Sequence, residues 1–317
     1  MNKSLKRISY WLESVSIYLT PHWCYRALVK WRLRHLSAAE RAQAQERAAY
    51  YARLSDNCRT RFSTSVGSFK FPYWAKHHFS MYFFDLHKAV FAFDKRLKFN
   101  YIFRDVTWEA PVAAFVKSRP LGNSHTHSVV MKLDSLRHFR FVQDPIPWSS
   151  KKDMLVSRNF VTQPHRRLLL ERYIDHPMCN IGKTNTESPE PHPEWVKDYM
   201  SLDEQLQYKF IACIEGNDVA TNLKWVMSSN SLAVMPRPRF ETWFMEGTLQ
   251  PGVHYVEVKR DYSDLIDQMQ YYLAHPDEAE RIIANAHAYV AQFQNKRLEL
   301  ATQLATAQLY FERTHQL

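Results

Sequence analysis

Residues 210–235, FIACIEGNDVATNLKWVMSSNSLAVM, decide the fold class of this chain. The apolar runs at 210–214 and 232–235 have the length of short strands, and we predict that both are buried. The polar turn between them leads into residues 220–229, where apolar side chains recur at helical spacing. A strand, a helix and a second strand in this order predict a βαβ crossover between two parallel strands.

Lys224 lies near the start of that predicted helix, after a turn of small and polar residues. The first N–H groups of a helix have no partner within the helix, and the helix dipole is positive there. A strand, a tight turn and a helix start are therefore typical of an anion site. A lysine at this position favours phosphate, although an ordinary crossover with a solvated lysine explains the same residues equally well.

The segments on either side continue the alternation of strands and helices. They are a short helix that begins at the capping box Ser201-Leu202-Asp203-Glu204, a short helix near 240–247, a strand at 253–258, and helices at 263–274, 277–293 and 295–313. Strands that alternate with helices predict a parallel sheet covered on both faces, so the expected fold class is α/β.

The N-terminal half has a less regular pattern. We expect helices at 5–19, at 22–36 and from the capping box at Ser37 to about Leu54, followed by strands at 99–103, 128–133 and 139–142. Farther along, the segment 179–194 is rich in Pro, Asn, Thr and Glu, which predicts a long surface loop.

The composition favours an anionic partner. The chain has 317 residues, enough for two α/β domains, and a formal net charge of +10. Its first two predicted helices carry Trp11, Trp23 and Trp31 among many basic residues. Such helices either lie on an anionic membrane surface or pack their aromatic side on the protein. The sequence has no signal-peptide pattern, no apolar run of membrane-spanning length and no CxxC pair, so we expect a soluble or peripheral protein with reduced thiols.

Three residues are candidates for chemistry. Asp105 follows the predicted strand 99–103, and ligands of open α/β sheets bind beyond the carboxyl ends of strands. It is either a general base or a loop carboxylate paired with Arg104 or a nearby lysine. Arg158 and Arg166 bracket a turn, where guanidinium groups suit a diphosphate but also fit a solvated basic helix start.

A metal has little support in the sequence. The histidine pairs His77-His78 and His125/His127 have no accompanying carboxylate at metal-ligand spacing. The chain also lacks an Asp-x-Asp pair, a Walker motif, GxSxG and GxGxxG. We therefore expect no metal ligand and no cofactor.

Several segments together resemble glycosyltransferase family 90, which includes bacterial lipopolysaccharide-core glycosyltransferases, protein O-glucosyltransferases and capsule xylosyltransferases. The resemblance covers about residues 98–295. It is carried by YKF at 208–210, EGND at 215–218, KW at 224–225, SNS at 229–231, FETWFMEG at 240–247, PGVHYV at 251–256 and KRDYSDL at 259–265, with RDV at 104–106, KSRP at 117–120, RHF at 137–139 and Asp144. One departure is Asn159, where the family usually has glycine; asparagine tolerates a left-handed turn but adds bulk.

The resemblance implies a GT-B architecture, with two Rossmann-like domains facing a cleft, a UDP-sugar donor and an inverting, metal-independent transfer. Asp105 matches the catalytic base, which deprotonates the acceptor hydroxyl as it attacks the anomeric carbon. Arg166 matches the arginine that binds the diphosphate. The resemblance also implies that Glu241 or Glu246 binds the ribose hydroxyls, and the sequence does not choose between the two. The other donor-binding residues implied are Arg158, Thr162, Gly216, Asn217, Asp218, Ala220, Thr221, Asn222 and Lys224.

The expected domains are a basic helical segment 1–55, a Rossmann-like acceptor domain 56–150, a Rossmann-like nucleotide-sugar domain 151–295 and a C-terminal helix 296–317. The expected function is transfer of glucose or galactose from a UDP-hexose to the lipopolysaccharide or lipo-oligosaccharide core. The protein would act in the cytoplasm on the inner face of the bacterial inner membrane, without nucleic acid. The alternatives are transfer to capsule or exopolysaccharide, and a non-catalytic basic protein that binds RNA or membrane.

Overall fold

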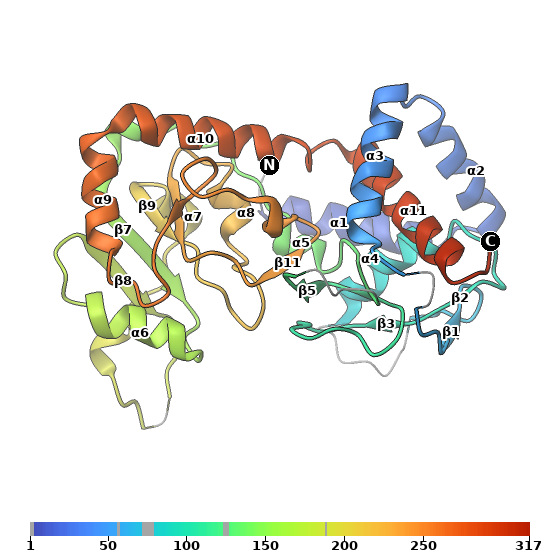
Figure 1. Cartoon of the computed structure of the whole chain (residues 1–317), viewed down its shortest axis with the longest axis horizontal. Helices are drawn as coiled ribbons and strands as arrows, with labels where there is room; N and C mark the ends of the chain where they lie inside the picture. Colours follow the sequence, from blue (N-terminus) through green and yellow to red (C-terminus); the bar gives the residue numbers. More distant parts are fainter. Residues whose placement is uncertain (1–2, 56–57, 72–78, 123–126, 188) are drawn as a thin grey trace. The chain divides into compact units, whose positions relative to one another are not determined.

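The computed structural model describes residues 3–55, 58–71, 79–122, 127–187 and 189–317 (Figure 1). The chain divides into two compact units. Unit 1 comprises Met1–His138, Phe240–Met245 and Phe293–Leu317, and unit 2 comprises Phe139–Arg239 and Glu246–Gln292. The chain thus returns to unit 1 for six residues in the middle of unit 2 and again at its end. These boundaries differ from the expected division at residue 150 and from a separate C-terminal helix.

Unit 2 is built on one parallel sheet of five strands in the order β12-β10-β9-β7-β8. Figure 1 labels β7, β8 and β9 of this sheet. The strands are β7 (Lys152–Asn159), β8 (Cys179–Lys183), β9 (Tyr208–Ala212), β10 (Leu232–Met235) and β12 (Val256–Glu257). The predicted crossover is confirmed, because β9 and β10 are parallel and Leu232 lies opposite Phe210. Both strands are buried along nearly their whole length, as their continuous apolar sequences predict.

Five α-helices accompany this sheet. They are α6 (Pro164–Tyr173), α7 (Leu202–Gln205), α8 (Leu223–Val226), α9 (Leu265–Ala274) and α10 (Pro276–Ala291). Phe210 lies opposite Leu232, and Val234 lies opposite Val256. All four belong to one buried cluster with Leu169 of α6 and Met269 of α9. The sheet therefore carries the core of unit 2.

Unit 1 contains a smaller parallel sheet and most of the long helices. The sheet has the order β3-β4-β6, with β3 (Tyr101–Ile102), β4 (Ala114–Val116) and β6 (Ser128–Val130). Two antiparallel pairs accompany it, β1 (Thr64–Ser65) with β2 (Lys98–Phe99) and β5 (Ser118–Pro120) with β11 (Phe240–Thr242). The helices are α1 (Lys3–Leu19), α2 (His22–Leu33), α3 (Ala38–Tyr51), α4 (Ser80–Val90), α5 (Ser135–His138) and α11 (Lys296–Arg313).

Helix α11 packs beside α3, although more than 240 residues separate them in the sequence (Figure 1). Glu299 of α11 is buried and accepts hydrogen bonds from Arg47 of α3 (2.7 Å), from Lys132 (2.6 Å) and from the indole of Trp243 (2.9 Å). The three donors satisfy the hydrogen-bonding capacity that burial of this carboxylate requires. These bonds hold α11 in place within unit 1.

Several predicted elements are confirmed. The capping boxes at Ser37 and Ser201 form as expected and begin α3 and α7. The helices predicted at 5–19, 22–36, 263–274, 277–293 and 295–313 are present within a few residues. Among the described residues, no helix is long and apolar enough to cross a membrane.

Other predicted elements are wrong or too long. The helix at 220–229 shrinks to α8, residues 139–142 form no strand, and the strand at 253–258 is only two residues long. The expected loop 179–194 begins with β8. This strand lies at the edge of the sheet and contains polar residues, so its sequence resembles that of a loop. No helix forms at 240–247, because the first residues of this segment form β11 and pair with β5. A 3-10 turn at Glu246–Thr248 follows. The strand at 128–133 stops at Val130, and α3 ends at Tyr51.

Candidate active site

In unit 1, three charged residues follow the carboxyl ends of neighbouring parallel strands. Asp105 follows β3, Lys117 directly follows β4, and Asp134 comes four residues after β6. The carboxyl ends of parallel strands meet at one edge of a sheet, and this edge is where ligands of α/β proteins bind. The small sheet therefore gathers Asp105, Lys117 and Asp134 in one place.

Asp105 pairs with the Nζ of Lys117, whose side chain is almost fully buried at 2% exposed. The side chain of Asp105 is 27% exposed, so the carboxylate is held by Lys117 and is partly accessible to solvent. This is the pairing with a nearby lysine that the sequence offered as the alternative to a general base. A partly exposed carboxylate at a sheet edge can accept a proton from a ligand that binds there, so the role of general base stays a prediction.

Asp134 is a second carboxylate at this edge, and it is buried. Its backbone has φ of 55°, a left-handed conformation that is uncommon outside glycine and is often found at functional sites. One carboxylate oxygen accepts from Arg137 Nε (2.7 Å), and the other accepts a hydrogen bond from no described residue. Burial raises the pKa of Asp134 to about 6, opposed by the charges of Arg137 and Lys117.

Tyr82 of α4 belongs to the same group. Burial raises its pKa to about 12, and the charges of Lys117, Asp134 and Asp105 also act on its hydroxyl. The sequence-based search missed both Tyr82 and Asp134. The signal for Asp134 was present, since it follows a predicted strand as Asp105 does, whereas a tyrosine within a helix gives no such signal.

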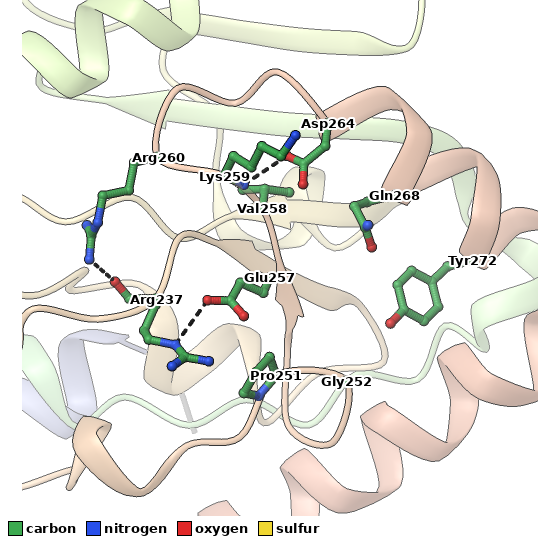
Figure 2. Close-up of a pocket in the computed structure, with 10 residues that line it drawn as sticks. All are labelled: Arg237, Pro251, Gly252, Glu257, Val258, Lys259, Arg260, Asp264, Gln268 and Tyr272. Carbon is green, nitrogen blue, oxygen red and sulfur yellow. Dashed lines mark hydrogen bonds and ion pairs between the residues drawn. The ribbon is translucent and has the colours of Figure 1, made fainter.

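In unit 2, the carboxyl edge of the large sheet carries a pocket of about 570 Å³ (Figure 2). Arg237 comes two residues after β10, and Lys259 and Arg260 follow β12 at the same edge. Arg237 pairs with Glu257 (3.1 Å), and Arg260 donates to the carbonyl of Arg237 (2.8 Å). Three cations on adjacent strand ends make this pocket suited to an anion. The sequence-based search did not single them out as site residues.

Arg166 is bound to main-chain carbonyls. Its guanidinium donates to Ile214 (2.9 Å), to Glu215 (2.9 Å) and to Phe160 (2.7 Å), and it packs close to Gly216, where an added Cβ would lie 3.3 Å away. Burial lowers the pKa of this guanidinium. Arg166 therefore ties the segment after β7 to the segment after β9.

Arg158 is also engaged within the sheet, and Thr162 is exposed. Arg158 donates to the carbonyl of Asn180 (2.9 Å) and to its side-chain oxygen (2.7 Å), which links β7 to β8. Asn159 ends β7 in an extended conformation and donates to Ser157 Oγ (2.6 Å). The left-handed turn that asparagine would tolerate is not formed there.

The turn at 216–222 lies beside the start of α6. The exposed Asn217 accepts from Gln163 (3.0 Å), and Asn222 donates to the carbonyl of Ala212 (2.9 Å). Asp218 and Ala220 are buried, and Thr221 is half-buried. The turn thus contacts Gln163 and Arg166 at the carboxyl edge of β7 and β9, and the donor-binding role of these residues stays a prediction.

Lys224 and Glu246 form a buried ion pair in unit 2. The Nζ–Oε1 distance is 2.5 Å, and the side chains are 0% and 1% exposed. Lys224 thus faces a carboxylate inside the protein, and α8, a single turn of four residues, offers no long helix start beside it.

Glu241, the other ribose candidate, belongs to unit 1. It is fully buried and accepts from Arg119 Nε (2.7 Å) and from the hydroxyl of Tyr50. Burial is the main cause that raises the pKa of Tyr50. Glu241 and Glu246 thus lie in different units, each with a buried cationic partner.

His77, His78 and His125 lie outside the described residues. His127 accepts from the backbone N–H of Arg59 (3.1 Å) and lies near Glu109 (3.8 Å). Within the ranges that the structure describes, no three His, Cys, Asp or Glu side chains gather as metal ligands would. The four cysteines are free thiols.

Comparison with known proteins identifies the chain. The family model of glycosyl transferase family 90 matches residues 138–298. The O-glucosyltransferase LpsA of Dichelobacter nodosus is 40% identical over 299 residues, which is 92% of this chain and 91% of that protein. Protein O-glucosyltransferase 3 of Rattus norvegicus is 30% identical over 84 residues, 26% of this chain and 16% of that protein. The chain is therefore a member of glycosyltransferase family 90.

Proposed function

We propose that the protein is an inverting hexosyltransferase that moves glucose or galactose from a UDP-sugar to the core oligosaccharide of lipopolysaccharide or lipo-oligosaccharide. The observation that carries this proposal is the Asp105 carboxylate, which is partly exposed at a sheet edge and paired with buried Lys117. Membership of the family supports sugar transfer, and the similarity to a protein named O-glucosyltransferase LpsA favours glucose.

In the proposed reaction, Asp105 accepts the proton of an acceptor hydroxyl while that oxygen attacks the anomeric carbon of the donor. The new carbon–oxygen bond forms on one face of the sugar as the bond to UDP breaks on the other, so the configuration inverts. The charge of Lys117 attracts the ionised carboxylate and holds it in place. Correct positioning of the base relative to the hydroxyl supplies much of the rate.

The departing UDP gains negative charge, which fixed cations stabilise without reorganisation. Arg237, Lys259 and Arg260 surround a pocket large enough for a nucleotide, and they lead the candidates for this task. In this proposal the cations replace a metal ion. Arg166 and the turn at 216–222 shape the neighbouring part of the same sheet edge.

The proposal assigns unit 1 to the acceptor and unit 2 to the nucleotide-sugar, the division of tasks of a GT-B fold. The protein would work in the cytoplasm on the inner face of the inner membrane, where the acceptor is anchored. The strongly positive charge of the chain suits a surface of anionic lipids and an acceptor that carries phosphate.

Substitution Asp105→Asn tests the assignment of the base. We expect transfer from UDP-glucose to fall by a factor of about 100 or more, the usual contribution of a general base, while UDP binding measured by calorimetry is unchanged. Asp94→Asn is the matched control, since Asp94 is an exposed carboxylate of the same unit that pairs with Arg96. Equal turnover of Asp105→Asn and Asp94→Asn would show that Asp105 is not the base.

A further inference from the structure

Helix α1 has two different apolar faces, and only one of them is buried. Tyr10, Trp11 and Tyr18 face α4: the Tyr10 hydroxyl donates to Asp85 (2.9 Å), and the ring of Trp11 meets Phe84 edge-on, with centroids 5.7 Å apart. These contacts attach α1 firmly to unit 1. The aromatic residues of this helix thus pack on the protein.

The opposite face of α1 is apolar and exposed. It consists of Leu5 (56% exposed), Ile8 (54%), Leu12 (67%), Val15 (43%) and Leu19 (73%), which we call the α1 stripe. The intervals of three and four residues place all five along one line of the helix. No described residue buries this line, and five large apolar side chains exposed side by side mark an interaction surface.

The next helix adds two further exposed features. Trp23 is 74% exposed and Trp31 is 52% exposed on α2, whose Tyr25 and Val29 are buried instead. Exposed basic residues lie on the same helix, among them Arg26 and Lys30. In sequence, residues 3–34 contain seven Lys or Arg and one acidic residue, so this helical pair carries most of the net positive charge of the chain.

We propose that the α1 stripe is a docking face for an anionic lipid bilayer. The apolar line would enter the boundary between headgroups and acyl chains, tryptophans are favoured at that depth, and the basic residues of α1 and α2 would meet the lipid phosphates. A second copy of the chain fits less well, because pairing two such helices would bring two strongly basic segments together. The inference rests on the proposed function in one respect: a lipid-anchored acceptor gives the enzyme a reason to dock.

The test uses the full-length protein and sedimentation with vesicles. One vesicle preparation contains equal parts phosphatidylethanolamine and phosphatidylglycerol, and the other contains phosphatidylcholine alone. The variant is Leu12→Gln/Leu19→Gln, which changes two exposed side chains and keeps good helix formers. The matched control is Tyr199→Gln, which removes an equally exposed large side chain (74%) from unit 2.

We expect the wild type and Tyr199→Gln to bind the anionic vesicles, more weakly as salt is raised, and to bind phosphatidylcholine poorly. The double variant should lose at least about tenfold in affinity, since burial of two leucines is removed. Equal binding of the double variant and the wild type would overturn the proposal. So would a dimeric wild type, measured by light scattering, that becomes monomeric in the double variant.

A second assay separates this inference from the proposed function. Transfer to a delipidated, soluble core oligosaccharide does not require docking, so the double variant should keep wild-type turnover there. Loss of vesicle binding with turnover retained supports the docking face. Vesicle binding by a wild type that transfers no sugar to any acceptor would refute the proposed function and leave the docking face standing.

Discussion

At the scale of single residues, two lysine–carboxylate pairs differ in the exposure of the carboxylate, and this difference decides which pair a substrate can reach. The pair of Lys117 and Asp105 has one partner open to solvent, so the carboxylate is able to meet a substrate. The pair of Lys224 and Glu246 is closed on both sides. Each of the four residues has an apolar neighbour in the sequence, which cannot reveal this difference, because burial depends on what packs over each side chain.

Substitution Lys224→Met should destabilise the protein strongly. It leaves the Glu246 carboxylate buried without its cation, and breaking such a pair costs about 3–5 kcal/mol of unfolding free energy. Lys209→Met is the control, because its partner Asp153 is 64% exposed and such pairs contribute at most about 1 kcal/mol. Denaturant unfolding measures both. A Lys224→Met protein as stable as Lys209→Met, with weaker UDP binding, would instead favour the phosphate role.

Asp134 should make stability depend on pH. Its pKa is about 6 in the folded protein and near 4 when unfolded, because burial disfavours the charged carboxylate. The folded state thus holds the proton more tightly, and the favourable contribution present below pH 4 is lost as the pH rises through 6. Relative to Asp134→Asn, the wild type should lose up to about 3 kcal/mol of unfolding free energy between pH 4 and pH 8. Parallel pH profiles for the two proteins would contradict this.

At the scale of elements, the sequence predicted the strands and helix starts that depend on neighbouring residues alone. The strands β9 and β10 are uninterrupted apolar runs, and the capping boxes at Ser37 and Ser201 are fixed by local hydrogen bonds. Strand β8 was missed because Asn180, Gly182 and Lys183 are typical of loops. Its polar side chains are satisfied by tertiary contacts: Asn180 bonds with Arg158 and Tyr208, and Lys183 pairs with Glu190, seven residues on (2.5 Å).

The loop after β7 gives a prediction at this scale. Arg166→Ala removes three hydrogen bonds to carbonyls, one in this loop and two in the segment after β9, and we expect a loss of at least about 1.5 kcal/mol in unfolding free energy. The adjacent Arg167→Ala serves as control, since that side chain pairs with Glu187 (3.0 Å) where both are half-exposed, and its loss should change stability by about 0.5 kcal/mol or less. Equal stability of the two variants would mean that Arg166 does not hold the loop.

At the scale of the whole molecule, the sequence predicted α/β layers but not how the chain is shared between the units. The apolar spacing of α11 shows that this helix has a buried side, but it does not show that the partner is α3. The return of Phe240–Met245 to unit 1 depends on pairing between β11 and β5, a contact across about 120 residues. Partners far apart in the sequence set the positions of Glu241 and Glu299. The residues next to them in the sequence therefore do not predict that these carboxylates form buried ion pairs.

The central claim is that the chain uses a uridine diphosphate sugar. The most direct measurement is calorimetric titration of the protein with UDP, and with GDP as control, first in EDTA and then in magnesium. The account predicts that UDP binds with the same affinity in both buffers and that GDP does not bind. Absence of UDP binding in both buffers, or equal binding of UDP and GDP, would contradict it.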